Sequence, residues 1–101
     1  HQFMSKKEVI EELIIESVRL LAEDFEIESL ECPSAATMLY GIGGSLDSMA
    51  LVNLIADIED AILEKFSISI SLADEKAISA RHSPYRSVTS LAEAVIERMP
   101  S

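Results

Sequence analysis

The sequence contains few of the residues that mark disulfide-linked, fibrous or disordered chains. Its 101 residues include one cysteine, three glycines, three prolines and no tryptophan. The single cysteine, Cys32, cannot form an internal disulfide, so we expect a reducing, cytoplasmic location. The small share of glycine and proline argues against a collagen-like, linker-like or disordered chain. We interpret residues 1–4 as a cloning remnant and start, and residues 5–99 as one small domain.

Basic side chains are also scarce. Eight lysines and arginines stand against 18 aspartates and glutamates, which gives a net charge of -10. Nucleic-acid binding needs clustered lysine and arginine, and an acidic surface is repelled by anionic lipid headgroups. No uninterrupted apolar run approaches the roughly 20 residues of a membrane-spanning helix, and no secretory signal is recognisable. We therefore expect neither a nucleic acid nor a membrane as partner, and a monomeric chain.

The acidic residues are concentrated in the middle of the chain. Residues 8–75 hold 16 acidic and two basic side chains, a local charge of -14, whereas the sequence from Lys76 onward carries +2. Such a run is usually a solvated face. It is equally suited to a docking surface for basic partners, where charge sets the encounter rate and the specificity. Both interpretations remain open at this point.

The first helix is predicted by its cap and its periodicity. Ser5 and Glu8 have the spacing of a capping box, in which each side chain bonds to the backbone of the other residue. Apolar residues then recur at helical spacing from Ile10 to Phe25. The pattern predicts an amphipathic, acidic helix over about residues 6–24.

A second helix is predicted to start near Asp47 or Ser48 and to reach Phe66. It is apolar over more than half its girth, which is typical of a central helix contacted from several sides. Its apolar residues are Met49, Leu51, Val52, Leu54, Ile55, Ile58, Ile62, Leu63 and Phe66. Its polar remainder is nearly all acidic and comprises Asp57, Glu59, Asp60 and Glu64.

The segments around these two helices are predicted as follows. Residues 26–44 form a long loop, broken by Pro33 and three glycines and held to the core by its own apolar side chains. Those side chains are Leu30, Met38, Leu39, Tyr40 and Ile42. Residues 66–72 alternate apolar and polar but lack a partner strand, so we expect an extended connector.

A short third helix is predicted from a cap at Ser71 to about Ala80, and a last helix follows Thr89. Leu91, Ala94, Val95 and Met99 share one face of the last helix. The predicted fold is all-α: a four-helix antiparallel bundle with three long helices, one short helix and a long first loop.

No catalytic or metal-binding set is visible in the sequence. His82 lies in a predicted turn without a second histidine or cysteine at metal-ligand spacing. Cys32 lies among acidic residues, which disfavour a reactive thiolate. The three glycines that precede the second helix lack the lysine and the strand of a phosphate-binding loop. We therefore expect no enzyme active site and no metal site.

The feature that stands out is a serine at the start of the most hydrophobic helix. This serine is Ser48, and it follows a glycine-rich loop in the segment Gly43-Gly44-Ser45-Leu46-Asp47-Ser48-Met49. A helix cap alone explains one serine or aspartate at this place. A serine hydroxyl here is also open to modification, and the helix N-terminus suits a phosphodiester because its free N–H groups and dipole favour an anion.

The chain resembles the acyl carrier proteins, from about Ser5 to Met99. The resemblance is carried by Leu46-Asp47-Ser48-Met49, which is similar to the Asp-Ser-Leu/Met attachment motif of that family, together with Gly44 and the helix pattern. It implies a four-helix bundle in which Ser48 carries 4'-phosphopantetheine, transferred from coenzyme A by a Mg²⁺-dependent holo-carrier synthase. The thiol of that arm would hold an acyl group as a thioester.

The same resemblance implies roles for further residues. Asp47 and Met49 match the neighbours of the modified serine. Glu59 and Asp60 match acidic residues that meet basic patches on the synthase and on acyl-transferring enzymes. Asp57 and Glu64 of the same helix are further partner-binding candidates. Ile58 and Ile62 match positions that border an acyl chain.

Three alternatives stay open. The longer second helix and the enlarged segment 73–86 suggest a specialised carrier for lipid, polyketide or related biosynthesis rather than the one of general fatty acid biosynthesis. The motif is also similar to that of D-alanyl and peptidyl carriers, so the cargo could be aminoacyl. An unmodified acidic interaction module is the third alternative, because fold does not fix function.

The attachment site itself also has an alternative. Ser45 is a rival attachment site with a poorer position relative to the helix.

Overall fold

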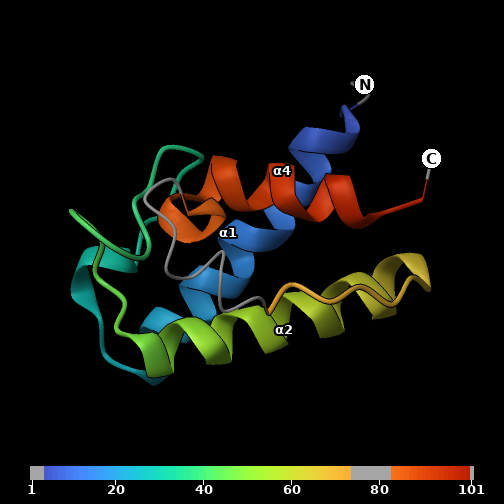
Figure 1. Cartoon of the computed structure of the whole chain (residues 1–101). Coiled ribbons are helices and arrows are strands. Elements are labelled where there is room, and N and C mark those ends of the chain that lie inside the picture. Colours follow the sequence, from blue (N-terminus) through green and yellow to red (C-terminus); the bar gives the residue numbers. More distant parts are fainter. Residues whose placement is uncertain (1–3, 74–82, 101) are drawn as a thin grey trace.

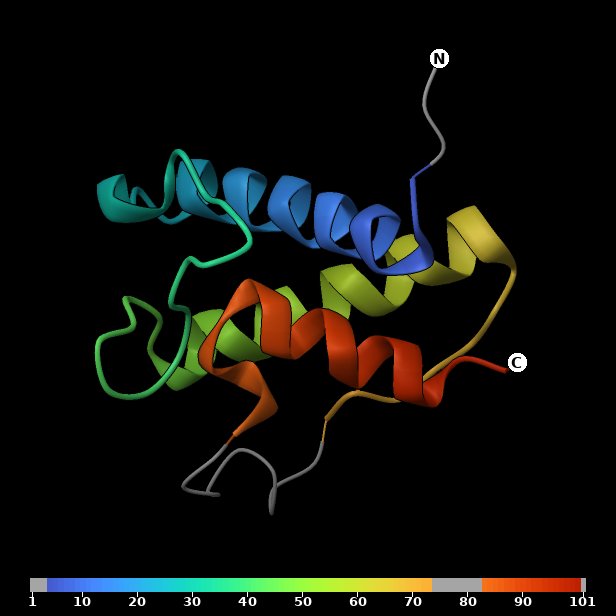
Figure 2. The same cartoon turned by 90° about the horizontal axis from the view of Figure 1, so that it is seen from above.

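The computed structural model describes residues 4–73 and 83–100 of the chain. These residues form helices and loops but no strand, which confirms the all-α class. Their elements in chain order are α1 (Lys6–Asp24), η1 (Glu28–Leu30), α2 (Ser48–Phe66), η2 (Pro84–Arg86) and α4 (Val88–Arg98). Helix α1 runs opposite to both α2 and α4, as Figures 1 and 2 show.

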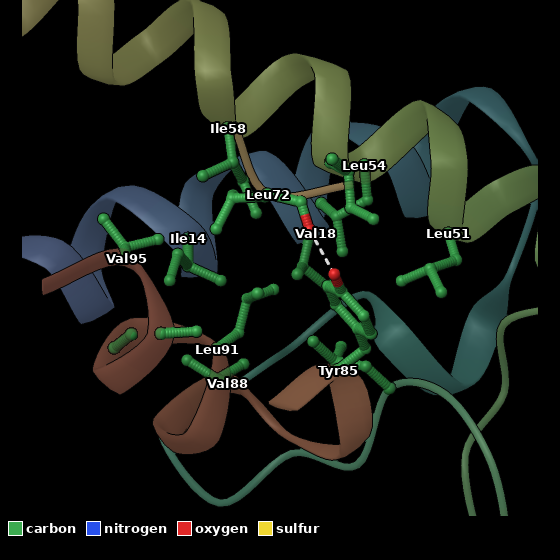
Figure 3. Packing of buried hydrophobic residues seen from close by; sticks show 14 of the residues in the cluster. Ile14, Val18, Leu51, Leu54, Ile58, Leu72, Tyr85, Val88, Leu91 and Val95 are labelled. Carbon is green, nitrogen blue, oxygen red and sulfur yellow. Dashed lines mark hydrogen bonds between the residues drawn. The ribbon is translucent and has the colours of Figure 1, made fainter. Parts of the chain in front are cut away.

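One hydrophobic core joins the three long helices. Ile14 of α1, Ile58 of α2 and Leu91 of α4 are fully buried and converge in its centre (Figure 3). Tyr85 of η2 is also fully buried, and its hydroxyl donates a hydrogen bond to the backbone carbonyl of Leu72. The core therefore includes loop residues as well as helix faces.

Helix α1 packs against both α2 and α4, and α2 contributes to the core that it shares with them. The apolar surface of α2 is wider than the part that packs in this core. Met49, Val52 and Leu63 are 74%, 59% and 51% exposed, respectively. The sequence shows that these residues are apolar. It does not show whether other residues cover them, and in the described part of the chain none does so fully.

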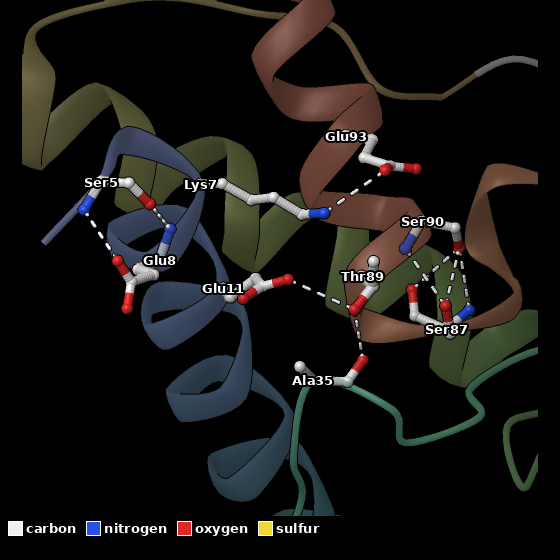
Figure 4. A network of polar contacts seen from close by, with 9 residues as sticks. All are labelled: Ser5, Lys7, Glu8, Glu11, Ala35, Ser87, Thr89, Ser90 and Glu93. Carbon is white, nitrogen blue, oxygen red and sulfur yellow. Dashed lines mark hydrogen bonds and ion pairs between the residues drawn. The ribbon is translucent and has the colours of Figure 1, made fainter.

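Side-chain caps define where α1 and α4 begin. The Ser5 hydroxyl accepts the Glu8 N–H, and the Glu8 carboxylate accepts the Ser5 N–H, so the predicted capping box is confirmed (Figure 4). These bonds from Ser5 lower the pKa of Glu8 below its ordinary value. Helix α4 begins at Val88 rather than after Thr89, because Ser87 caps it.

The long loop after α1 is fastened to the start of α4. The Leu39 N–H donates to the carbonyl of Arg86 at 2.6 Å, and the Val88 N–H donates to the carbonyl of Thr37 at 3.1 Å. Leu30 and Leu39 are buried, as expected for a loop held down by its own side chains. The prediction was wrong for Ile42, which is 93% exposed.

The segment after α2 is extended, as predicted. Ser67 ends α2 in the left-handed conformation, with a φ of 56°. Residues 68–73 then run alongside the helices without regular structure, and the Ile68, Ile70 and Leu72 side chains pack on or in the core. The predicted short helix from Ser71 to about Ala80 falls largely on residues 74–82, which lie outside the described residues.

Candidate functional site

Ser48 is the first residue of α2. The preceding residue, Asp47, is the N-cap: its carboxylate accepts the N–H of Ala50 at 2.8 Å. This bond ties up one of the free N–H groups at the start of the helix. Ser48 itself is exposed, and its hydroxyl makes no hydrogen bond with any residue in the described ranges. The cap is thus supplied by Asp47 and leaves the serine hydroxyl available.

A tight loop brings the chain into this helix start. The Leu39 carbonyl accepts the Leu46 N–H at 2.9 Å, and Leu46 is buried. Gly44 crosses the same carbonyl so closely that a Cβ there would lie 2.4 Å from the Leu39 oxygen. Only glycine fits this crossing without a shift of the backbone. Gly44 and Leu46 therefore fix the direction in which the chain reaches Asp47 and Ser48.

Ser45 differs from Ser48 in its bonding. Both serines are exposed. The Ser45 hydroxyl lies 2.7 Å from the Ser29 hydroxyl, in a hydrogen bond that links the glycine-rich loop to η1. This bond restrains the Ser45 hydroxyl, whereas the Ser48 hydroxyl makes no such bond within the described residues. The geometry favours Ser48 over its rival.

An apolar strip runs along α2 from the serine. Met49 and Val52 lie one turn apart on the helix surface, and Leu63 continues the same side three turns further on. All three are more than half exposed. We call these three residues the apolar strip of α2. Met49 and Val52 form a small exposed apolar area beside Ser48, and Leu63 is a separate exposed residue on the same side of the helix.

Three of the four predicted partner-binding acids lie together. Asp57, Asp60 and Glu64 line a groove between α1 and α2. Burial raises the pKa of Asp57 above its ordinary value, and the nearby Asp60 and Asp24 carboxylates raise it further. These acids stand roughly 14–24 Å from Ser48 along the helix axis, given a rise of about 1.5 Å per residue.

Glu59 does not join that group. Its carboxylate accepts the N–H of Leu72 at 2.8 Å, and its side chain is only partly exposed. It therefore holds the connector after α2 and is less accessible to a partner than Asp57 and Asp60.

The two predicted acyl-chain positions lie in the core. Ile58 and Ile62 are fully buried, and neither lines the groove between α1 and α2. An acyl chain could reach them only if the core opened.

The sequence did not predict that α1 contributes to this groove. Glu12, Glu16, Leu20 and Asp24 of α1 also line the groove. A signal was present: Leu20 is apolar, yet it lies off the buried stripe of Ile10, Ile14, Val18 and Leu21 and is 53% exposed.

The described residues contain no group of three or more histidine, cysteine, aspartate or glutamate side chains placed to hold a metal ion. Cys32 is exposed and not in a disulfide. His82, which the sequence suggested as a surface residue, lies outside the described ranges.

Comparison of the chain with protein-family models, with curated proteins and with solved structures gives no match. Within residues 4–73 and 83–100, no helix combines the length and the apolar character needed to cross a membrane.

Proposed function

We propose that this chain is an acyl carrier protein whose Ser48 hydroxyl is the attachment point for 4'-phosphopantetheine. The observation that carries the proposal is the exposed hydroxyl at the first residue of α2, which bonds to none of the described residues and lies beside the cap that Asp47 supplies. In this proposal the complete chain is a cytoplasmic, monomeric four-helix bundle and not an enzyme. Its short third helix falls on the segment after Ser71.

The residues at the start of α2 fit a phosphodiester. An anion at the first residue of a helix is stabilised by the free N–H groups and by the helix dipole, by about 0.3–1 kcal/mol at an exposed position. In the attachment step the Ser48 oxygen forms a bond to the phosphorus of the pantetheine phosphate of coenzyme A. The pyrophosphate P–O bond breaks, adenosine 3',5'-bisphosphate leaves, and the hydroxyl proton passes to a base of the synthase.

When bound, 4'-phosphopantetheine supplies a terminal thiol that carries an acyl group as a thioester. The chain itself contributes an anchor and a docking surface. A flexible arm on a fixed anchor raises the effective concentration of its cargo at the active site of each partner. The fully buried Ile58 and Ile62 support cargo that is presented outside the core, unless the core opens.

The surface next to Ser48 supports docking of partner enzymes. Met49 and Val52 of the apolar strip lie within about one turn of the serine and present exposed apolar area. Asp57 and Asp60 add negative charge further along the same helix. Complementary charge raises the association rate with a basic partner, and buried apolar contacts supply affinity.

The test is the intact mass of the chain after incubation with coenzyme A, Mg²⁺ and a broad-specificity phosphopantetheinyl transferase. Ser48→Ala and Ser45→Ala are the matched variants. We expect a gain of one phosphopantetheine in the wild type and in Ser45→Ala, and no gain in Ser48→Ala. Circular dichroism checks that each variant is folded.

A gain that disappears only in Ser45→Ala would move the site to Ser45. The absence of any gain in folded protein would favour the unmodified acidic interaction module. Once the site is known, loading with acyl or aminoacyl donors separates an acyl carrier for lipid or polyketide synthesis from an aminoacyl carrier.

A further inference from the structure

The groove between α1 and α2 is a feature in its own right. Its volume is about 800 Å³, and it is lined by most of α1 and by the second half of α2, from Asp57 to Lys65. From Val9 to Asp24 it follows α1 for roughly 22 Å, given a rise of about 1.5 Å per residue. Leu13, Leu20 and Ala61 supply apolar floor within it. The span of the lining along α1 is that of a helix of about 15 residues.

The rim of the groove is almost entirely acidic. Its one basic lining residue is Lys65, within the described part of the chain. The six acidic lining residues are Glu12, Glu16, Asp24, Asp57, Asp60 and Glu64. The carboxylates crowd each other, since Asp60 and Asp24 both raise the pKa of Asp57. A cationic occupant would relieve this repulsion while covering the apolar floor.

A second copy of this chain does not supply such an occupant from its described helices. Helices α1 and α2 are themselves acidic, and α4 carries two glutamates against one arginine. At a net charge of -10, two copies repel each other before any contact forms. Among the described residues, therefore, no helix of a second copy complements the charge of the groove.

We propose that the groove between α1 and α2 is a docking site for a basic amphipathic helix of a partner protein. Apolar side chains at i, i+3, i+4 and i+7 of such a helix seat on Leu13, Leu20 and Ala61. Lysine and arginine on its two edges meet the carboxylates of the two rims. The occupant is one helix of about 15 residues, which matches the length of the groove.

This site is separate from the serine and does not depend on its modification. The lining residues nearest to Ser48 in sequence are Asp57 and Asp60, and neither Ser48 nor the apolar strip contributes to the groove. The inference therefore holds for the unmodified chain, and its failure would leave the proposal for Ser48 untouched.

The probe is a fluorescent peptide of about 15 leucine and lysine residues, arranged with helical periodicity. Its binding to the unmodified full chain is measured by fluorescence anisotropy at about 0.15 M NaCl, where long-range attraction is largely screened. A second peptide of the same composition, with its order scrambled to remove the apolar face, tests whether charge alone suffices.

Matched variants locate the site on the chain. Leu20→Ser removes an apolar residue of the floor that is 53% exposed, and Leu63→Ser removes one of equal size outside the groove that is 51% exposed. Asp60→Lys reverses a charge on the rim, and Glu23→Lys reverses one on α1 outside it. All four residues are at the surface, so the fold should persist, as circular dichroism will check.

We expect Leu20→Ser and Asp60→Lys to weaken binding of the helical peptide by at least about fivefold. We expect Leu63→Ser and Glu23→Lys to change it by less than about twofold. The scrambled peptide should bind at least about tenfold more weakly. The proposal would be overturned by equal binding of the two peptides, by equal effects within either pair of variants, or by no binding.

Discussion

The carboxylate of Glu59 accepts a hydrogen bond of 2.8 Å from the backbone N–H of Leu72, which lies 13 residues further along the chain. The Leu72 carbonyl accepts the hydroxyl of Tyr85. Close by, Arg98 Nε donates to the carbonyl of Ser71 at 3.0 Å. Side chains from α2, η2 and α4 therefore hold one extended connector, which has no backbone ladder of its own in the described residues.

Replacing Glu59 should loosen this connector. Glu59→Ala removes the acceptor for a partly buried N–H, and we expect the free energy of unfolding to fall by about 1 kcal/mol. Glu59→Gln keeps an acceptor oxygen and should retain most of that stability. The measurement is urea denaturation followed by circular dichroism.

Glu64→Ala is the matched control for Glu59. Glu64 is exposed on the same helix and makes no hydrogen bond with the described residues. Its removal relieves repulsion in an acidic groove, so the stability should be unchanged or higher. Equal losses in Glu59→Ala and Glu64→Ala would show that the bond to Leu72 contributes nothing.

The Tyr85 hydroxyl should contribute measurably to the stability of the fold. Tyr85→Phe leaves the buried Leu72 carbonyl without this donor, and we expect a loss of about 1–3 kcal/mol in the free energy of unfolding. Tyr40→Phe is the control, because the hydroxyl of Tyr40 has no hydrogen-bond partner in the described ranges. It should change stability by less than about 0.5 kcal/mol. Similar values for the two variants would contradict this role of Tyr85.

The sequence predicted the helices well because their signals are local. The capping box of Ser5 and Glu8 gives the start of α1, and Asp47 gives the start of α2. The start of α4 was misjudged by about two residues. In its capping box Ser87 pairs with Ser90, so a serine occupies the position where the usual box has glutamate or glutamine.

Long-range relationships could not be predicted in this way. Nothing in the spacing of Glu59 distinguishes it from Asp57 and Asp60, because its partner Leu72 lies 13 residues further along, in a segment whose path over the helices depends on the tertiary structure. Ile42 was expected to anchor its loop. Yet the left-handed glycines on either side, Gly41 and Gly43, turn the chain so that its side chain is exposed.

The candidate site was predicted in part. The exposure of Ser48 at the start of a helix agrees with what the motif predicted. In the part of the chain that the structure describes, its hydroxyl has no hydrogen-bond partner, whereas that of Ser45 bonds to Ser29. The groove was not foreseen, because it needs the relative positions of α1 and α2. The one sequence signal was Leu20, an apolar residue outside the buried stripe of α1. It indicated that a second face of α1 could contact another molecule.

Gly44 should be harder to replace than the neighbouring glycines. A Cβ at Gly44 would meet the Leu39 oxygen at 2.4 Å, and this oxygen already accepts the Leu46 N–H. We expect Gly44→Ala to lower the free energy of unfolding by about 2–3 kcal/mol. The matched control, Gly43→Ala, has open space but a φ of 83°, and should lose only about 1–2 kcal/mol. Thermal and urea unfolding measure both, and the reverse order would contradict the close crossing.

The last prediction concerns pH and the acidic groove. Burial, and then the Asp60 and Asp24 carboxylates, raise the pKa of Asp57 in the folded chain above its ordinary value of 3.8. Between these two values the folded chain binds more protons than the unfolded one, so the free energy of unfolding falls as the pH rises through that window. At neutral pH Asp57 is ionised in both states, so the folded chain bears the whole free-energy cost of its raised pKa. Asp57→Asn removes the titrating group and should therefore be more stable than the wild type at neutral pH.

This gain should shrink as the pH is lowered through the raised pKa and vanish below pH 3.8, where Asp57 is protonated in both states. Urea unfolding at a series of pH values measures the difference between Asp57→Asn and the wild type. Glu23→Gln is the control, because it removes one charge from α1 outside the groove. A smaller gain in the control would tie the repulsion to the groove, whereas equal gains would assign it to the net charge of the whole chain. Because a bound cationic helix would neutralise the same carboxylates, it should also reduce the advantage of Asp57→Asn at neutral pH.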